Sequence, residues 1–218
     1  MKKLVPINKL ILFTLLTALI TIVAIKFLDA RIAASVMNFI RSVHKLRQVT
    51  ERIPDILPHL VGIGTVLLWG IYFYRSRKTT DDNEVQFLRL AATALPVAYL
   101  IKTLLKFVFG RTGPRGWLIH KEPLAFHWFK IWSSSFPSGH MLVFVAFGAA
   151  VLFYYPKYRL LVLILLGLLG IALIGTDYHF LSDVIAGAYF GFMTTYFIKF
   201  LFDRKSHQVK QSLSKGAE

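Results

Sequence analysis

Hydrophobic residues in this 218-residue chain are gathered into long runs and are not spread along single faces of surface helices. A helix needs about 20 mainly apolar residues to cross the hydrocarbon core of a bilayer. Six runs approach that length, and the connections between most of them are short: 9–27, 59–75, 86–105, 139–155, 160–176 and 181–202. The pattern predicts an all-α fold, an integral membrane bundle of six transmembrane helices that forms a single membrane domain over residues 1–218.

Three further segments carry their own patterns. Between the first two runs, Ile32, Val36 and Phe39 recur at helical spacing among basic residues, which predicts an amphipathic interfacial helix between helices 1 and 2. Residues 203–218 have no apolar face, and we expect a disordered cytoplasmic tail there. The basic start of the chain is also typical of a cleaved signal peptide, but the long first run and the charges of "DARIAAS" after it favour an uncleaved anchor.

The composition supports a membrane protein and narrows its partners. Hydrophobic residues make up 56% of the chain, and the mean hydropathy is +0.57. The net charge of +15 lies in separate loops and forms no continuous basic stripe, so it fits anionic lipid headgroups better than nucleic acid. The distribution of Lys and Arg over alternate loops favours cytoplasmic termini. Because the chain has no cysteine, disulfides and thiolate metal sites are excluded.

Polar residues outside the termini concentrate in two loops that six spans would place on one face of the membrane, opposite the termini. These loops hold three clusters: "KFVFGRTGPRG" from Lys106, "SFPSGH" ending at His140, and "HFLSD" from His179 to Asp183. His179 and Asp183 are four residues apart and therefore share a helix face. The topology thus predicts one polar site assembled from distant parts of the chain.

The residue types in these clusters suit a phosphate ester. Lys106 and Arg111 can supply cations, and the guanidinium of arginine matches phosphate geometry. A Pro-Ser-Gly turn that opens a helix leaves free N–H groups at the positive end of the helix dipole, so Ser138 and Gly139 are candidate donors. Two histidines can divide the roles of nucleophile and acid, and an aspartate can orient one imidazole.

These clusters resemble the motifs of the type-2 phosphatidic acid phosphatase superfamily, the membrane lipid phosphatases that share an active site with vanadium-dependent haloperoxidases. The family motifs read K-x6-R-P, P-S-G-H and S-R-x5-H-x3-D, and the resemblance covers residues 86–202. It implies that His179 is a nucleophile that forms a phosphohistidine, that Asp183 orients it, and that His140 protonates the leaving alkoxide. The phosphate-binding residues that it implies are Lys106, Arg111, Ser138 and Gly139. The scheme requires no metal ion and no cofactor.

The chain departs from the family pattern at two motif positions. Gly113 stands where the first motif has its arginine, and Ala172 and Leu173 stand where the third motif has Ser-Arg. A missing arginine leaves less positive charge around a transferring phosphoryl group. Arg115 or Lys102 could compensate, and we include Arg115 among the candidate phosphate-binding residues.

The resulting hypothesis is a phosphatase of the bacterial inner membrane that acts at the periplasmic face on a phosphorylated membrane lipid. By resemblance, the candidate substrates are undecaprenyl diphosphate, phosphatidylglycerol phosphate, phosphatidic acid and the lipid A phosphates. Two alternatives stay open. The protein could pass phosphate to a second lipid as a phosphotransferase, or it could be a non-catalytic lipid-binding or transport relative.

Overall fold

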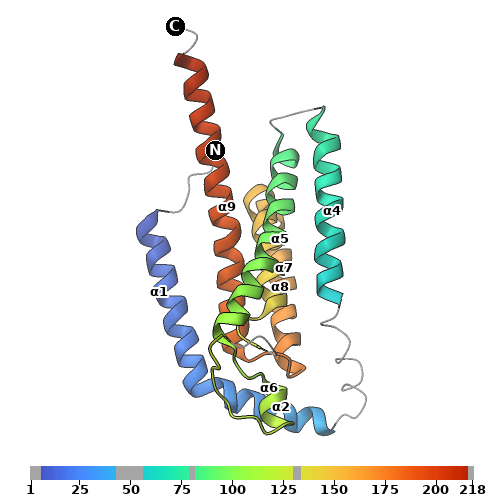
Figure 1. Ribbon diagram of the computed structural model, residues 1–218, viewed down its shortest axis with the longest axis vertical. Coiled ribbons are helices and arrows are strands. Elements are labelled where there is room, and N and C mark those ends of the chain that lie inside the picture. Colours follow the sequence, from blue (N-terminus) through green and yellow to red (C-terminus); the bar gives the residue numbers. More distant parts are fainter. Residues whose placement is uncertain (1–5, 43–55, 79–81, 130–133, 216–218) are drawn as a thin grey trace.

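The computed structural model describes residues 6–42, 56–78, 82–129 and 134–215, and these form helices and loops without a β-strand. Figure 1 shows the helices, most of which lie roughly along the long axis of the molecule. In chain order they are α1 (Ile7–Val23), a π-helical turn (Ala24–Leu28), α2 (Asp29–Ser42), α4 (Leu57–Ser76), α5 (Asn83–Phe109), α6 (Pro114–Leu118), α7 (Gly139–Tyr154), a 3₁₀ turn (Pro156–Tyr158), α8 (Arg159–Gly175) and α9 (Leu181–Lys215).

Each of the six predicted apolar runs is helical. Five helical stretches are long and apolar enough to cross a membrane: 7–39, 57–76, 83–109, 156–175 and 181–205. The fourth run forms α7, which has only 16 residues and is shorter than the other five. The chain is therefore a multi-pass, all-helical membrane protein with five candidate spans among the described residues, and the count of six remains a prediction.

The segment after the first span is helical, as the spacing of its apolar residues suggests. The π-helical turn joins α1 to α2 without a break, and α2 leaves the axis of α1 to cross one end of the bundle near α6 (Figure 1). Ala33 and Met37 are buried on one face of α2, whereas Phe39 is exposed. This helix has the expected amphipathic pattern, while its position at a membrane interface remains a prediction, and residues 43–55 lie outside the described part of the chain.

The C-terminal segment differs from the prediction. Of the tail over 203–218 that was predicted to be disordered, residues 203–215 continue helix α9, which extends beyond the other helices (Figure 1), and residues 216–218 lie outside the described part of the chain. Once the first turns of a helix are formed, each further residue adds a hydrogen bond at little cost. The polar tail contains three Lys and two Gln, which favour helix, so it continues a helix that the packed part of α9 has already nucleated.

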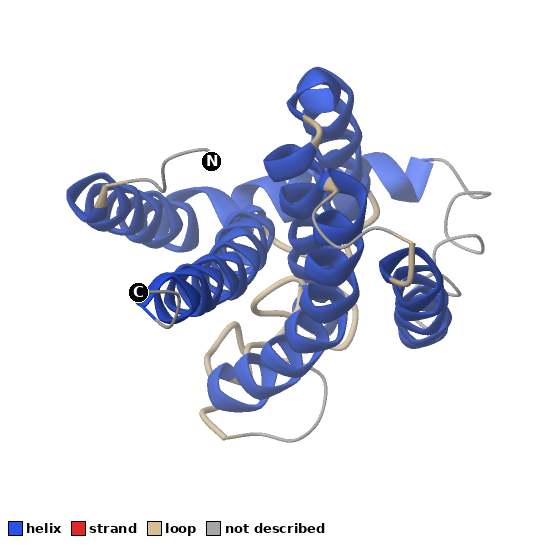
Figure 2. Ribbon diagram, turned by 90° about the horizontal axis from the view of Figure 1, so that it is seen from above, coloured by secondary structure: helices blue, strands red, loops and turns tan. Residues whose placement is uncertain are grey.

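Helix α7 lies between α5 and α9 at the centre of the bundle, whereas α1 and α4 lie on opposite sides of it (Figure 2). Two glycines of α9 allow the closest approach. A side chain at Gly187 would come within 2.6 Å of the Ser138 carbonyl oxygen, and one at Gly191 would collide with the Leu142 carbonyl. The Thr195 hydroxyl donates to the Ala146 carbonyl at 2.8 Å. These contacts run along the first half of α7 and the first half of α9, and they hold the starts of the two helices, where the polar clusters lie, close together.

Candidate active site

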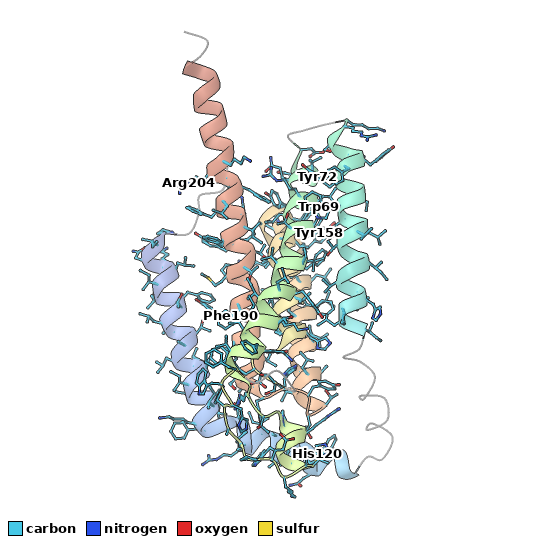
Figure 3. All side chains as sticks on the ribbon, viewed as in Figure 1. Trp69, Tyr72, His120, Tyr158, Phe190 and Arg204 are labelled. Carbon is cyan, nitrogen blue, oxygen red and sulfur yellow. The ribbon has the colours of Figure 1, made fainter. Side chains whose placement is uncertain are left out.

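A polar cavity of about 490 Å³ opens where α5 ends and α7 and α9 begin, with α6 beside it. Figure 3 labels one of its lining residues, His120, at the same end of the molecule as α2 and α6. The side chains around it come from all three predicted clusters. The lining residues used below are Lys102, Lys106, Gly113, Arg115, His120, Glu122, Gly139, His140, Tyr178 and His179.

The two predicted histidines line the same cavity. His140 lies in the first turn of α7, and His179 precedes α9. Burial lowers the pKa of His179, and the nearby Lys106 lowers it further, while Asp183 acts in the opposite direction. The structure thus places a mainly neutral imidazole, the nucleophilic form, beside a second histidine.

Asp183 lies directly behind His179 and is fully buried. Its Oδ2 is 3.6 Å from Nδ1 of His179, an ion-pair distance slightly longer than a hydrogen bond. The same Oδ2 accepts from the backbone N–H of Phe180 at 3.0 Å. The carboxylate is therefore placed to orient the ring through Nδ1 and leave the other ring nitrogen for chemistry.

Ser138 does not line the cavity, which differs from its predicted role as a phosphate contact. Its backbone N–H donates to the carbonyl of Asp183 at 2.9 Å, and its hydroxyl caps α7 by accepting from the N–H of Met141. The serine therefore ties the start of α7 to α9. Gly139 does line the cavity, at the first position of α7, where backbone N–H groups have no partner inside the helix.

Arg111 also lies outside the cavity lining, although its residue type suggested a phosphate ligand. Its guanidinium is about 1% exposed and donates to Asp183 Oδ1 and to the Ser182 hydroxyl, each at 2.7 Å. A third hydrogen bond of 2.7 Å reaches Oδ2 of Asp29 in α2. With two carboxylates already paired to it, Arg111 belongs to a buried ionic cluster behind the site.

Three other cationic side chains reach the cavity. Lys106 lies in the last turn of α5, and Lys102 lies one turn earlier with its stem against Gly139. Arg115 projects from α6, donates to the Thr176 carbonyl at 3.0 Å and lies 4.3 Å above the ring of Tyr178. The backbone acceptor and the aromatic ring hold this guanidinium in one place, so Arg115 is the fixed arginine of the cavity.

Neither position where the family pattern has an arginine can readily hold one here. Leu173 is buried in an apolar cluster with Met141, Val145 and Val184. Gly113 lines the cavity, but a Cβ there would meet the Cβ of Ser135 at 3.2 Å. The fold therefore supplies positive charge from α5 and α6 in place of these two positions.

Sequence reasoning missed Asp29, and it considered Lys102 as a possible replacement for a missing arginine, not as a candidate site residue. A carboxylate directly after a long apolar run is costly near a membrane unless it has a partner, and this was the available signal for Asp29. Nothing in the local sequence distinguished Lys102 from a headgroup-binding lysine. Among the described residues, no group of three or more His, Asp or Glu is arranged to hold a metal ion.

The described part of this all-helical membrane protein gathers two histidines and three cationic side chains around one cavity, with the Asp183 carboxylate behind one of the histidines. These are the side-chain types that phosphoryl transfer requires. The chain belongs to the PAP2 superfamily, whose family model matches residues 87–206, more than half of the chain. This match confirms the resemblance drawn from the three motifs. It makes the protein a multi-pass membrane phosphatase, a hydrolase with a lipid substrate.

Comparison with other proteins adds little detail. One similar solved structure is the crystal structure of the first transmembrane PAP2-type phosphatidylglycerolphosphate phosphatase from Bacillus subtilis. Its sequence is 21% identical to this chain. The match covers 92% of this chain and 96% of that one, with a TM-score of 0.43. No curated protein matches the chain.

Proposed function

We propose that this protein hydrolyses a phosphate monoester or diphosphate of a membrane lipid through a phosphohistidine on His179. The observation that supports this most strongly is the shared cavity, in which His140 and His179 face the same space and Asp183 stands behind only one of them. Two imidazoles in different surroundings can take different roles in one reaction. A histidine with a carboxylate at Nδ1 is the one suited to nucleophilic attack.

In the first step, Nε2 of His179 attacks phosphorus and the bond to the lipid oxygen breaks. The Asp183 carboxylate then stabilises the imidazolium that forms, through the proton on Nδ1. His140 donates a proton to the leaving oxygen, so a neutral lipid alcohol or a lipid phosphate departs. The distance of 3.6 Å between His179 and Asp183 fits a free enzyme, because such contacts often shorten when substrate binds.

In the second step, water attacks the phosphohistidine, His140 accepts a proton from that water, and inorganic phosphate leaves. This order restores the starting protonation of both histidines. Lys106, Arg115 and the N–H of Gly139 bind the phosphoryl oxygens in both steps, with Lys102 beside them. Arg111 and Ser138 act indirectly, since they hold Asp183 and the start of α7.

The substrate and the orientation are also proposals. The candidate lipids are undecaprenyl diphosphate, phosphatidylglycerol phosphate, phosphatidic acid and the lipid A phosphates. The cavity lies at the end of the bundle away from the C-terminus of α9 (Figure 1). Cytoplasmic termini would thus place the site at the periplasmic face of a bacterial inner membrane.

The decisive experiment measures phosphate release from these four lipids by the purified protein in detergent with EDTA present. The wild type should release phosphate from at least one, and His179→Ala should lower the rate at least about 10³-fold. His59→Ala is the matched control, because His59 is an exposed histidine of α4 outside the cavity, and it should retain wild-type activity. Activity that survives His179→Ala would contradict the mechanism. If the lipid phosphate is radiolabelled, label that moves to a second lipid without release of free phosphate would indicate a phosphotransferase.

A further inference from the structure

We infer that Asp29 is a positioning residue of this active site, which acts through Arg111 and Ser182 on the carboxylate behind His179. The inference rests on the proposed function. Asp29 lies in α2, far from the three motifs in sequence and outside the 87–206 segment that matches the family. The helices before that segment therefore contribute a residue to the active site.

The hydrogen bonds that the described part of the chain shows for the Asp29 carboxylate go to Ser182, at the start of α9, and to Arg111. Oδ1 accepts from the backbone N–H of Ser182 at 3.0 Å, and Oδ2 accepts a short hydrogen bond from the Ser182 hydroxyl. Oδ2 also accepts from Nη2 of Arg111 at 2.7 Å. Asp29 is fully buried, so water does not compete for these bonds. It fixes the residue adjacent to Asp183 and the guanidinium that contacts Asp183.

The contacts of Arg111 make this guanidinium a bridge and not a phosphate ligand. It lies 4.4 Å from the ring centre of Phe180 and 5.2 Å from that of Phe126, so aromatic rings flank it. One end faces Asp29, and the other faces Asp183. Because Asp29 holds Nη2, the Nη1 atom is kept directed at Asp183 and away from the cavity.

The charge of the cluster follows from this arrangement. Asp29 and Asp183 share one guanidinium, so the three side chains carry one net negative charge behind His179. Without the charge of Asp29, Asp183 and Arg111 would form a neutral pair, which stabilises an imidazolium less well. The other charged or titratable groups that line the cavity come from α5 to α7 and from the loops after α6 and before α9: Lys102, Lys106, Arg115, His120, Glu122, His140 and Tyr178.

Asp29→Asn tests the inference, since it keeps the volume and one acceptor but removes the charge. We expect a kcat about 10-fold lower or more, because the cation that forms on His179 loses stabilisation, as is typical when a supporting residue behind a reacting group is lost. The KM and the inhibition constant for inorganic phosphate should stay within about twofold, because Asp29 does not reach the cavity. Asp203→Asn is the matched control: Asp203 pairs with Lys199 elsewhere on α9, and its kcat should equal that of the wild type.

A wild-type kcat for folded Asp29→Asn would overturn the inference. A phosphate inhibition constant that weakens in parallel with kcat would also overturn it, since the variant would then be disturbing the phosphate site itself. If Asp29→Asn does not fold, Ser182→Ala takes its place, because it removes the hydroxyl between Asp29 and Arg111 and keeps the backbone N–H bond. A kcat about 3-fold lower or more at constant KM is then expected, and a wild-type kcat would refute the role.

A second readout separates this inference from the proposed function. Diethyl pyrocarbonate acylates neutral imidazoles, and mass spectrometry resolves the rates at His179 and His140. At pH 8, we expect the acylation rate of His179 to be several-fold lower in Asp29→Asn than in the wild type. The acylation rate of His140 in the same sample serves as the internal reference. If the wild type releases no phosphate from any lipid, the proposed function fails, and the His179 rate still decides the inference: an unchanged rate would contradict it.

Discussion

Arg111 and Arg115 lie four residues apart and differ in almost every contact. Arg111 is buried, bonded to Asp29 and Asp183, and absent from the cavity lining. Arg115 is partly exposed, lines the cavity, and is bonded only to the Thr176 carbonyl among the hydrogen-bond partners that the described structure shows. The charge of Arg111 is paired with two carboxylates of the protein, whereas Arg115 presents its charge at the cavity. Residue type alone therefore does not identify a phosphate ligand.

The backbone between the two residues explains the difference. Helix α5 ends at Phe109, and the next residue, Gly110, adopts a left-handed conformation with a φ of 53° that favours glycine. Arg111 then forms a single β-bridge with Phe126, and Pro114 starts α6 at a position that proline favours. The chain turns between the two arginines, so that Arg111 faces the bundle interior and Arg115 faces the cavity.

The largest effect is expected at Arg111. Arg111→Met keeps a long side chain but leaves two buried carboxylates without their cation, which costs about 3–5 kcal/mol of stability. The variant should be poorly folded or melt far below the wild type in a thermal-shift measurement in detergent. Arg75→Met is the control, since its ion pair with Glu84 is exposed, and its melting temperature should not change. Wild-type stability of Arg111→Met would contradict the buried cluster.

An intermediate effect, on rate and not on folding, is expected at Arg115. Arg115→Met should melt near the wild-type temperature and lower kcat/KM for lipid phosphate about 10²–10³-fold, the size expected for one lost contact to the transferring group. Arg115→Lys should recover part of this loss, since it restores the charge without the planar fork. Arg159→Met, at the exposed start of α8, should behave like the wild type. Unchanged kinetics of Arg115→Met would remove Arg115 from the phosphate site.

The smallest effect, on stability, is expected at Asp177. This carboxylate is buried like that of Asp183, but it lacks the ion pair with Arg111 that Asp183 has. Burial raises the pKa of Asp177 to about 6, and Arg115 only partly opposes this. Neither carboxylate oxygen has a hydrogen-bond partner in the described part of the chain. Since the folded state prefers the protonated acid, the contribution of Asp177 to stability falls as the pH rises from the unfolded value near 4 through 6.

Asp177→Asn removes this pH dependence and tolerates the positive φ of 51° at this position. It should raise the melting temperature by about 2–4 °C at pH 8 and leave it unchanged at pH 4. Asp82→Asn, at the exposed start of α5, should show neither effect. An equal gain at both pH values would show that the penalty does not come from ionisation.

The parts of the molecule that the sequence predicted well depend on local signals. Apolar runs of sufficient length located the helices, and the P-S-G-H turn and the spacing of His179 and Asp183 located the histidine pair. The two predicted phosphate ligands that lie outside the cavity lining have partners distant in the chain. No local feature of the sequence shows that the backbone N–H of Ser138 donates to the carbonyl of Asp183. Nor does one show that Arg111 pairs with Asp29, which is 82 residues away.

The sequence by itself determined that this is a helical membrane protein of the PAP2 superfamily, because hydrophobic length and motif spacing are local properties. It also predicted a pair of histidines that the fold brings to one cavity. Only the tertiary structure decided which cations face the cavity. The direction of a side chain at a helix end depends on how the chain turns and on which distant carboxylate is buried beside it. The packing of α2 against the start of α9 brings Asp29 to Arg111, and among the described residues Arg115 is the arginine that lines the cavity.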